Sequence, residues 1–175
     1  MPRIPLPGAD EFAPYYGKYI AQLNGDDALT ALESQAVTTA KLLAATPESL
    51  AGHRYAPEKW SVREVVGHLS DGERVFAYRA LCVGRGDATA LPGFDENLYV
   101  PEGRFERRTL ADVAAEFAAV RLATLALFHS FDAQALLRRG TANGQPVSAR
   151  ALAAIIAGHE LHHVRLLRER YGLGG

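Results

Sequence analysis

The sequence predicts an all-α protein, a four-helix bundle with one long crossover loop. Four segments of about 20 residues carry apolar side chains at the spacing of an amphipathic helix, and none shows the sustained alternation of a strand. The loop over residues 85–108 is rich in glycine, proline and charge and is long enough to cross a whole helix, so the second and third helices can run parallel. With 175 residues and 48% hydrophobic content, the chain is sized for one domain.

The first long helix is expected over residues 27–46, because a proline follows directly. Residues 1–26 precede it as an N-terminal extension, in which a short helix over residues 15–23 ends at an Asn-Gly pair. We assign residues 27–175 to a single bundle domain. The apolar face of the first helix consists of Leu29, Leu32, Ala36, Ala40 and Leu43.

The other three helices are each marked by end signals. The second is expected over residues 61–84, where Ser61 and Glu64 have the spacing of a capping box. The third is expected over residues 109–130 and begins with a threonine that an acidic residue follows three positions later. The fourth is expected over residues 148–171, with a serine as its cap and a glycine after its last residue.

Three histidines are placed to bind one divalent metal ion. His159 and His163 lie four residues apart in the apolar stripe of the fourth helix, so both imidazoles share one face. His68 lies on the inward face of the second helix, and three histidine ligands would leave a coordination position for water or substrate, as catalytic sites do. A lone buried histidine is usually a satisfied core residue, but two on one stripe leave several ring nitrogens that a metal would satisfy.

A glycine precedes two of these histidines, since Gly67 comes before His68 and Gly158 before His159. Glycine inside a helix costs up to about 1 kcal/mol relative to alanine. We therefore expect that the absent side chains of the two glycines leave room, either for a close approach between helices or for an open path to the ion. Coincidence in a sequence rich in glycine and alanine is the alternative.

The segment from His159 to His163 also matches the HExxH pattern of zinc metalloproteases. Proteases that resemble this string take their third ligand from well downstream, and too few residues follow here, so a third ligand must come from upstream. Glu160 is a candidate general base beside a metal-bound water. The competing interpretation of Glu160, which we favour, is a solvent-facing helix carboxylate. The histidines expected at or near the surface, and not as ligands, are His53, His129 and His162.

Composition excludes several partners and compartments. There are 19 Lys and Arg against 20 Asp and Glu, with no block of like charge, so neither nucleic acid nor an anionic membrane surface is an expected partner. No apolar run reaches the roughly 20 residues of a membrane span, and the N-terminus has none of signal-peptide length. The single cysteine, Cys82, excludes an intramolecular disulfide and is expected as a small buried residue. We expect a cytoplasmic protein.

Two motifs resemble a known family. The run WSVREVVGHL at residues 60–69, followed by Arg79, resembles the signature around the first metal histidine of the DinB/YfiT-like four-helix-bundle superfamily. The run GHELHH at residues 158–163 resembles the C-terminal histidine pair of that superfamily, and residues 91–97 (LPGFDEN) are similar to a segment of many members. The resemblance covers roughly residues 27–171.

The resemblance implies an up-down-down-up bundle and a homodimer, because members frequently dimerise. It implies a zinc or nickel ion at the residues that match His68, His159 and His163. Some relatives are S-transferases or isomerases that use low-molecular-weight thiols such as bacillithiol or mycothiol, and others are described as metal-dependent hydrolases. The resemblance therefore defines a site more closely than a reaction.

Two main classes of function fit these observations. The first is a metal-dependent enzyme that acts on a small molecule, either by activating a thiol for transfer or by activating water for hydrolysis. Trp60, Arg79 and Asp95 are candidate substrate-binding residues; their structural alternatives are a core anchor, a salt-bridged bundle residue and a turn residue, respectively. The second class is a non-catalytic metal or small-molecule binding protein of a stress response. A helical interaction domain without a metal is a further alternative.

Overall fold

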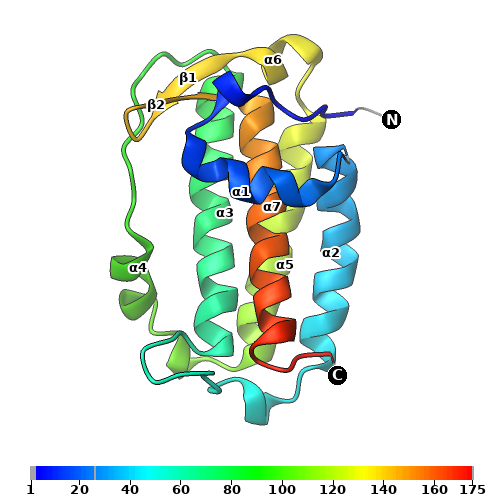
Figure 1. Cartoon of the computed structure of the whole chain (residues 1–175), viewed down its shortest axis with the longest axis vertical. Helices are drawn as coiled ribbons and strands as arrows, with labels where there is room; N and C mark the ends of the chain where they lie inside the picture. The colour runs from blue at the N-terminus through cyan, green and yellow to red at the C-terminus, as the bar shows by residue number, and fades with distance from the viewer. Residues whose placement is uncertain (1–2, 26, 175) are drawn as a thin grey trace.

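The computed structural model describes residues 3–25 and 27–174. Its four long helices form a bundle in which some neighbouring helices are parallel and others antiparallel. In Figure 1 the first of them runs down, the second and third run up, and the last runs down, so the middle two are parallel. The predicted all-α class and the up-down-down-up order are both confirmed. The bundle helices are α2 (Ala28–Ala45), α3 (Val62–Gly84), α5 (Leu110–His129) and α7 (Ala149–Glu169).

The ends of these helices are set by the predicted capping residues. At the start of α3 the Ser61 hydroxyl accepts a hydrogen bond from the backbone N–H of Glu64, and the Glu64 carboxylate accepts one from the backbone N–H of Ser61. Thr109 and Ser148 accept the equivalent bonds at the starts of α5 and α7. Asp27 caps α2 in the same way, so local side-chain chemistry determines where all four helices begin.

The crossover loop returns the chain along the whole length of α3 (Figure 1). It contains the short helix α4 (Glu96–Glu102) and then a 3-10 turn whose Phe105 side chain is buried against Gly67 of α3. A Cβ atom at Gly67 would overlap the Phe105 ring. The glycine does provide space, as predicted, but a loop side chain fills it instead of another bundle helix or a path to the ion.

A small β-hairpin, which the sequence analysis missed, closes the end of the bundle at which α7 begins. Strands β1 (Arg139–Ala142) and β2 (Gln145–Ser148) pair in antiparallel register and follow the short helix α6 (Ala133–Leu137). Its strands left no pattern in the sequence because each has only four residues, too few to show sustained alternation. The Asn143-Gly144 turn was the available signal, since both residues have positive φ angles (51° and 71°).

The N-terminal extension packs on the bundle instead of trailing from it. Its helix α1 (Gly17–Ile20) lies between two 3-10 turns and crosses over α7 (Figure 1). This helical stretch ends at Asn24 and Gly25 in the left-handed conformation, as predicted. The expected boundary with the bundle domain falls at residue 26, outside the described residues.

An ion pair fastens the extension to the start of α7. Glu11 is buried, and its carboxylate accepts hydrogen bonds from Nε (2.8 Å) and Nη2 of Arg150. The Arg150 hydrogen bonds lower the pKa of Glu11 to about 2, against the opposing effect of burial. The pair therefore stays charged at all but strongly acidic pH.

A single buried arginine contacts all four helices of the bundle. Arg121 of α5 donates from Nε (2.8 Å) and Nη2 (2.7 Å) to the two carboxylate oxygens of Glu73 on α3. Its Nη2 lies 2.6 Å from Oε2 of Glu160 on α7, and its Nη1 donates to the carbonyl oxygen of Leu32 on α2. Burial acts to lower the pKa of Arg121, but the hydrogen bonds and charges of the two carboxylates outweigh it and raise the pKa.

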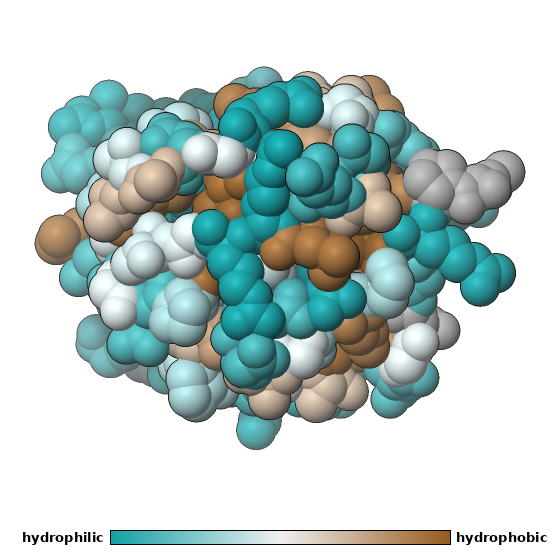
Figure 2. All heavy atoms as spheres, turned by 90° about the horizontal axis from the view of Figure 1, so that it is seen from above, coloured by the Kyte–Doolittle hydropathy of each residue, from teal (hydrophilic) through white to brown (hydrophobic). Residues whose placement is uncertain are grey.

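The surface at the hairpin end is mainly hydrophilic, with smaller apolar areas between the polar side chains (Figure 2). Below it, the buried apolar side chains form two clusters, and the first includes Cys82, whose predicted burial is confirmed. Within residues 3–25 and 27–174, the helices fall short of the length and apolar character that spanning a membrane would require.

We predict that Arg121→Met lowers the free energy of unfolding by about 3–5 kcal/mol, because it leaves two carboxylates buried without their cation. Urea denaturation followed by circular dichroism measures this. The matched control is Arg74→Met on α3, whose side chain is 48% exposed and paired with Asp71 and Glu116; its expected effect is below about 1 kcal/mol. Equal effects of the two substitutions would contradict the central role of Arg121.

A second prediction concerns the contact between α7 and the extension. A Cβ atom at Gly158 would overlap the backbone carbonyl of Tyr19, which cannot rotate away, so Gly158→Ala should destabilise the protein by about 1–3 kcal/mol. Gly72→Ala is the control, since its nearest neighbour is His159 Cε1 at 3.4 Å. Urea denaturation of both variants checks this, and a Gly158→Ala protein as stable as the control would count against the close approach.

Candidate metal centre

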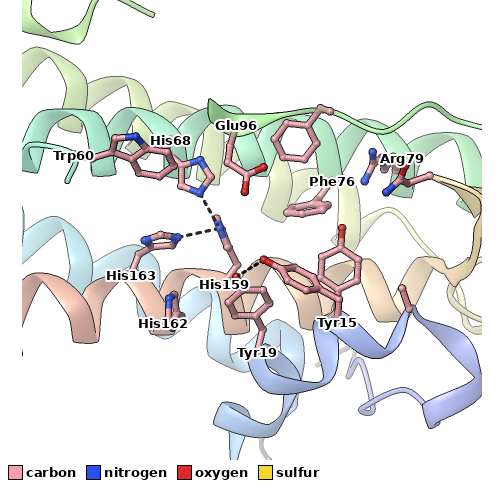
Figure 3. A pocket seen from close by; sticks show the side chains of 14 residues that line it. Tyr15, Tyr19, Trp60, His68, Phe76, Arg79, Glu96, His159, His162 and His163 are labelled. Carbon is pink, nitrogen blue, oxygen red and sulfur yellow. Dashed lines mark hydrogen bonds between the residues drawn. The ribbon is translucent and has the colours of Figure 1, made fainter. Parts of the chain in front are cut away.

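The three predicted histidines converge at the middle of the bundle. His68 projects from α3, and His159 and His163 project from successive turns of α7 (Figure 3). The Nε2 atom of His159 lies 3.0 Å from Nε2 of His68 and 3.1 Å from Nε2 of His163. The spacing of four residues on α7 thus brings both imidazoles to one point, as the helical geometry predicts.

Burial keeps all three imidazoles neutral at ordinary pH. Burial lowers the pKa of His68 to about 4. Burial, followed by the charges of neighbouring histidines, lowers the pKa of His159 and His163 well below the ordinary value. Each ring therefore has one nitrogen with an unprotonated lone pair, the form in which histidine binds metals.

This donor set fits a divalent ion. Three nitrogens held about 2.0–2.1 Å from a tetrahedral ion are about 3.3 Å apart, close to the two separations in the structure. The three candidate ligand atoms all lie within 4.8 Å of one another, and across the described residues no second group of three potential metal ligands is as close. Imidazole nitrogen suits zinc, nickel, copper and iron, so the set is selective for transition metals over calcium or magnesium.

The three histidines line one end of a cavity of about 310 Å³. In Figure 3 they lie beside Trp60 and His162, and the cavity continues past Phe76 to Arg79. An ion at the histidines would therefore have protein ligands on one side and space for a small molecule on the other. Space of this kind beside three ligands is what an open coordination position requires.

Two of the three predicted substrate-binding residues line this cavity. The Trp60 ring lies 4.8 Å from the His68 ring, and Arg79 is at the opposite end. Asp95 is exposed and is not one of the lining residues; its Oδ1 accepts the backbone N–H of Asn97 (2.9 Å) as the cap of α4. The loop contributes its neighbours Phe94 and Glu96 instead.

Glu160 is buried, and the interpretation that it faces solvent was wrong. Its carboxylate accepts a hydrogen bond from the Thr39 hydroxyl and pairs with Arg121. Burial raises its pKa, against the opposing charge of Arg121. Glu160 is absent from the described residues that line the cavity, so its position supports a structural role in holding α7.

The remaining histidines lie largely where they were expected. His53 and His129 are exposed. His162 is half-buried at the cavity wall, where its ring packs against Tyr19 and His163. None of the three belongs to the converging set.

Several cavity residues were missed because they belong to parts of the chain assigned no role. Tyr15 and Tyr19 of the N-terminal extension form part of the wall, and their four-residue spacing was a signal that both face one way. Glu96 comes from the crossover loop, and Asn143 from the tip of the unpredicted hairpin. These residues lie in separate segments of the chain, so no local sequence pattern could predict that they line one cavity.

Fold and site together define a class of protein: helical bundles with parallel middle helices and an open three-histidine centre. The chain belongs to the DinB superfamily, which matches residues 31–167. No curated protein matches the sequence of the chain.

Three solved structures share the fold. YfiT from Bacillus subtilis, described as a probable metal-dependent hydrolase with an unusual four-helix bundle topology, is 19% identical, with a TM-score of 0.66 over 95% of this chain and 93% of its own. A mycothiol-dependent maleylpyruvate isomerase is 13% identical, with a TM-score of 0.66 over 85% of this chain and 60% of its own. The DinB-like protein YjoA from Bacillus subtilis is 19% identical, with a TM-score of 0.60 over 83% and 89%. At these identities the likeness shows the fold alone.

We predict that the purified chain binds one zinc or nickel ion and that His68→Ala and His163→Ala each abolish this. Loss of a direct ligand should weaken metal binding by more than the roughly 10–100-fold typical of losing a residue that only hydrogen-bonds to a ligand. Metal analysis after loading and desalting measures the stoichiometry, with the exposed His53→Ala as control. Less than about 0.2 equivalents bound by the native chain would rule out the site.

Proposed function

We propose that this protein is a divalent-metal-dependent enzyme that acts on a small molecule, with zinc or nickel held by His68, His159 and His163. The observation that carries the proposal is the convergence of three neutral imidazoles at the wall of a 310 Å³ cavity. A purely structural metal site is closed by protein ligands, whereas this set leaves room beside it.

The chemistry we propose is thiol transfer. When bound, the ion would lower the pKa of a thiol at its open position, supplying a thiolate nucleophile at neutral pH. The three histidines orient that position toward the cavity, and Trp60, Tyr19 and Phe76 form aromatic walls beside it. The sulfur forms a bond to an electrophilic carbon, the leaving group departs with the electron pair of the broken bond, and the thiol proton passes to solvent.

The position of Glu160 does not support hydrolysis that uses this carboxylate as a general base, because Arg121 and Thr39 hold it outside the cavity lining. A bound divalent ion would lower the pKa of a water to about 7 without such a base, and it would deprotonate a bound thiol outright. We favour the thiol because it is the more fully ionised of the two at neutral pH.

Proteins of similar fold are described with each of the two chemistries. The isomerase with the similar fold is mycothiol-dependent, which favours a thiol cosubstrate, although this chain spans only 60% of its length. YfiT, which matches over nearly its whole length, is described as a probable metal-dependent hydrolase, so hydrolysis is the second candidate.

Turnover of model compounds tests the proposal. We predict that the metal-loaded chain accelerates the reaction of 1-chloro-2,4-dinitrobenzene with N-acetylcysteine, and that His68→Ala reduces the rate to that without enzyme while His53→Ala leaves it unchanged. Absorbance of the thioether product measures the rate. Turnover of 4-nitrophenyl acetate without thiol, and none of the first pair, would favour hydrolysis. Inactivity with both, despite stoichiometric metal, would indicate a non-catalytic binding protein.

A further inference from the structure

The end of the cavity opposite the histidines holds a buried arginine that the proposed chemistry does not use. Arg79 is only 4% exposed. Its guanidinium carbon lies 5.7 Å from the centres of the Phe76 and Phe94 rings, which are 6.0 Å apart, so the charged group lies beside this aromatic pair. Its Nη2 donates to the backbone carbonyl of Pro92 at 2.6 Å.

Arg79 has no carboxylate partner among the described residues, since none lies within 4.0 Å of its nitrogens. The expectation that it is a salt-bridged bundle residue was therefore wrong. The contrast with Arg121 is informative, because that equally buried arginine pairs with two carboxylates. Burying a cation without an anion is costly, and such a group is retained where an anion binds.

The neighbours of Arg79 are polar groups without formal positive charge. The Tyr16 hydroxyl is close enough that, although burial raises its pKa overall, the charge and hydrogen bond of Arg79 act to lower it. Asn143, at the tip of the hairpin, lines the same cavity. Of the five N–H donors on a guanidinium, the Pro92 carbonyl and the Tyr16 hydroxyl use two, so others are available to an anion.

Helical geometry aligns Arg79 with the histidine centre. Residues 68 and 79 are separated by about three turns of α3, so both side chains project from one face, roughly 16 Å apart along the axis. Phe76 lies between the two ends, with its ring 6.1 Å from the His159 ring. Figure 3 shows the same order, with the histidines at one end, Phe76 in the middle and Arg79 at the far end.

We propose that Arg79 binds the carboxylate of the substrate, whose flat or apolar body lies along Phe76 while its reacting atom faces the histidines. This assignment rests on the proposed function, and it adds the substrate class: a small carboxylic acid with an apolar portion next to its charged group. Two parallel N–H donors match the two oxygens of a carboxylate.

A singly charged carboxylate matches this cavity better than a phosphate does. Arg79 is the one arginine or lysine among the described cavity-lining residues, and the carboxylate of Glu96 lines the same cavity. Both ligands would meet Arg79 and Glu96, but the single charge of a carboxylate is balanced by Arg79 and is repelled less by Glu96 than the double charge of a phosphate.

Binding of a charged probe and its neutral analogue tests the proposal. The probes are 3-phenylpropionate and 3-phenylpropionamide, which share size and apolar body but differ in charge. Trp60 is the only tryptophan of the chain and lines the cavity, so its fluorescence reports occupancy. We expect the native, metal-loaded chain to bind the acid at least about tenfold more tightly than the amide, the worth of a charge-assisted pair.

Two variants test whether Arg79 causes the preference for the acid. In Arg79→Gln the acid and the amide should bind equally, with amide affinity retained, whereas the matched control Arg74→Gln on the same helix should keep the tenfold preference. If circular dichroism shows that Arg79→Gln is unfolded, Arg79→Lys replaces it; the loss of the planar fork should reduce the preference several-fold. No preference in the native chain, or a preference unchanged by the substitution at Arg79, would overturn the assignment.

Repeating the titrations after chelation separates this proposal from the proposed function. A preference that depends on Arg79 and survives without metal supports the carboxylate site even if the chain shows no turnover. A preference that disappears with the metal and persists in Arg79→Gln would mean that the probe binds the ion directly, and would overturn the role of Arg79.

Discussion

The bundle depends on one buried guanidinium. Arg121 projects from α5 and contacts Glu73 of α3, Glu160 of α7 and the carbonyl of Leu32 on α2, so a single side chain fixes the relative positions of all four helices. Glu160 directly follows His159, and holding its carboxylate fixes the rotation of α7 about its own axis. That rotation in turn points His159 and His163 at His68. The charge cluster in the core and the histidine centre are thus two consequences of the same helix placement.

The crossover topology explains why the centre opens into a cavity. Parallel α3 and α5 require a connection that returns along the bundle, and this connection brings Phe94 and Glu96 beside α3. The N-terminal segment supplies Tyr15 and Tyr19 from the other side, where Gly158 allows its backbone to approach α7. The helices therefore supply the metal ligands, while the loops and the extension enclose the space where a substrate would bind.

Local signals were sufficient for the helices and for the histidine set. The capping pair Ser61 and Glu64, and the four-residue spacing of His159 and His163, are properties of neighbouring residues, so they can be read without a structure. Glu160 and Arg121 could not, because their pairing joins residues on different helices. The short hairpin around Asn143 was not predicted for a different reason. Its strands are too short for a periodic pattern, and only the turn residues indicated it.

The proposed function requires that the three histidines bind one ion while a coordination position stays open. A crystal structure of the zinc- or nickel-loaded protein, with anomalous scattering recorded at the metal edge, tests it most directly. We predict one anomalous peak about 2.0–2.1 Å from Nε2 of His68, His159 and His163, with a non-protein ligand facing the cavity. A peak bound by fewer than two of these nitrogens, or an ion closed off by a fourth protein side chain, would contradict it.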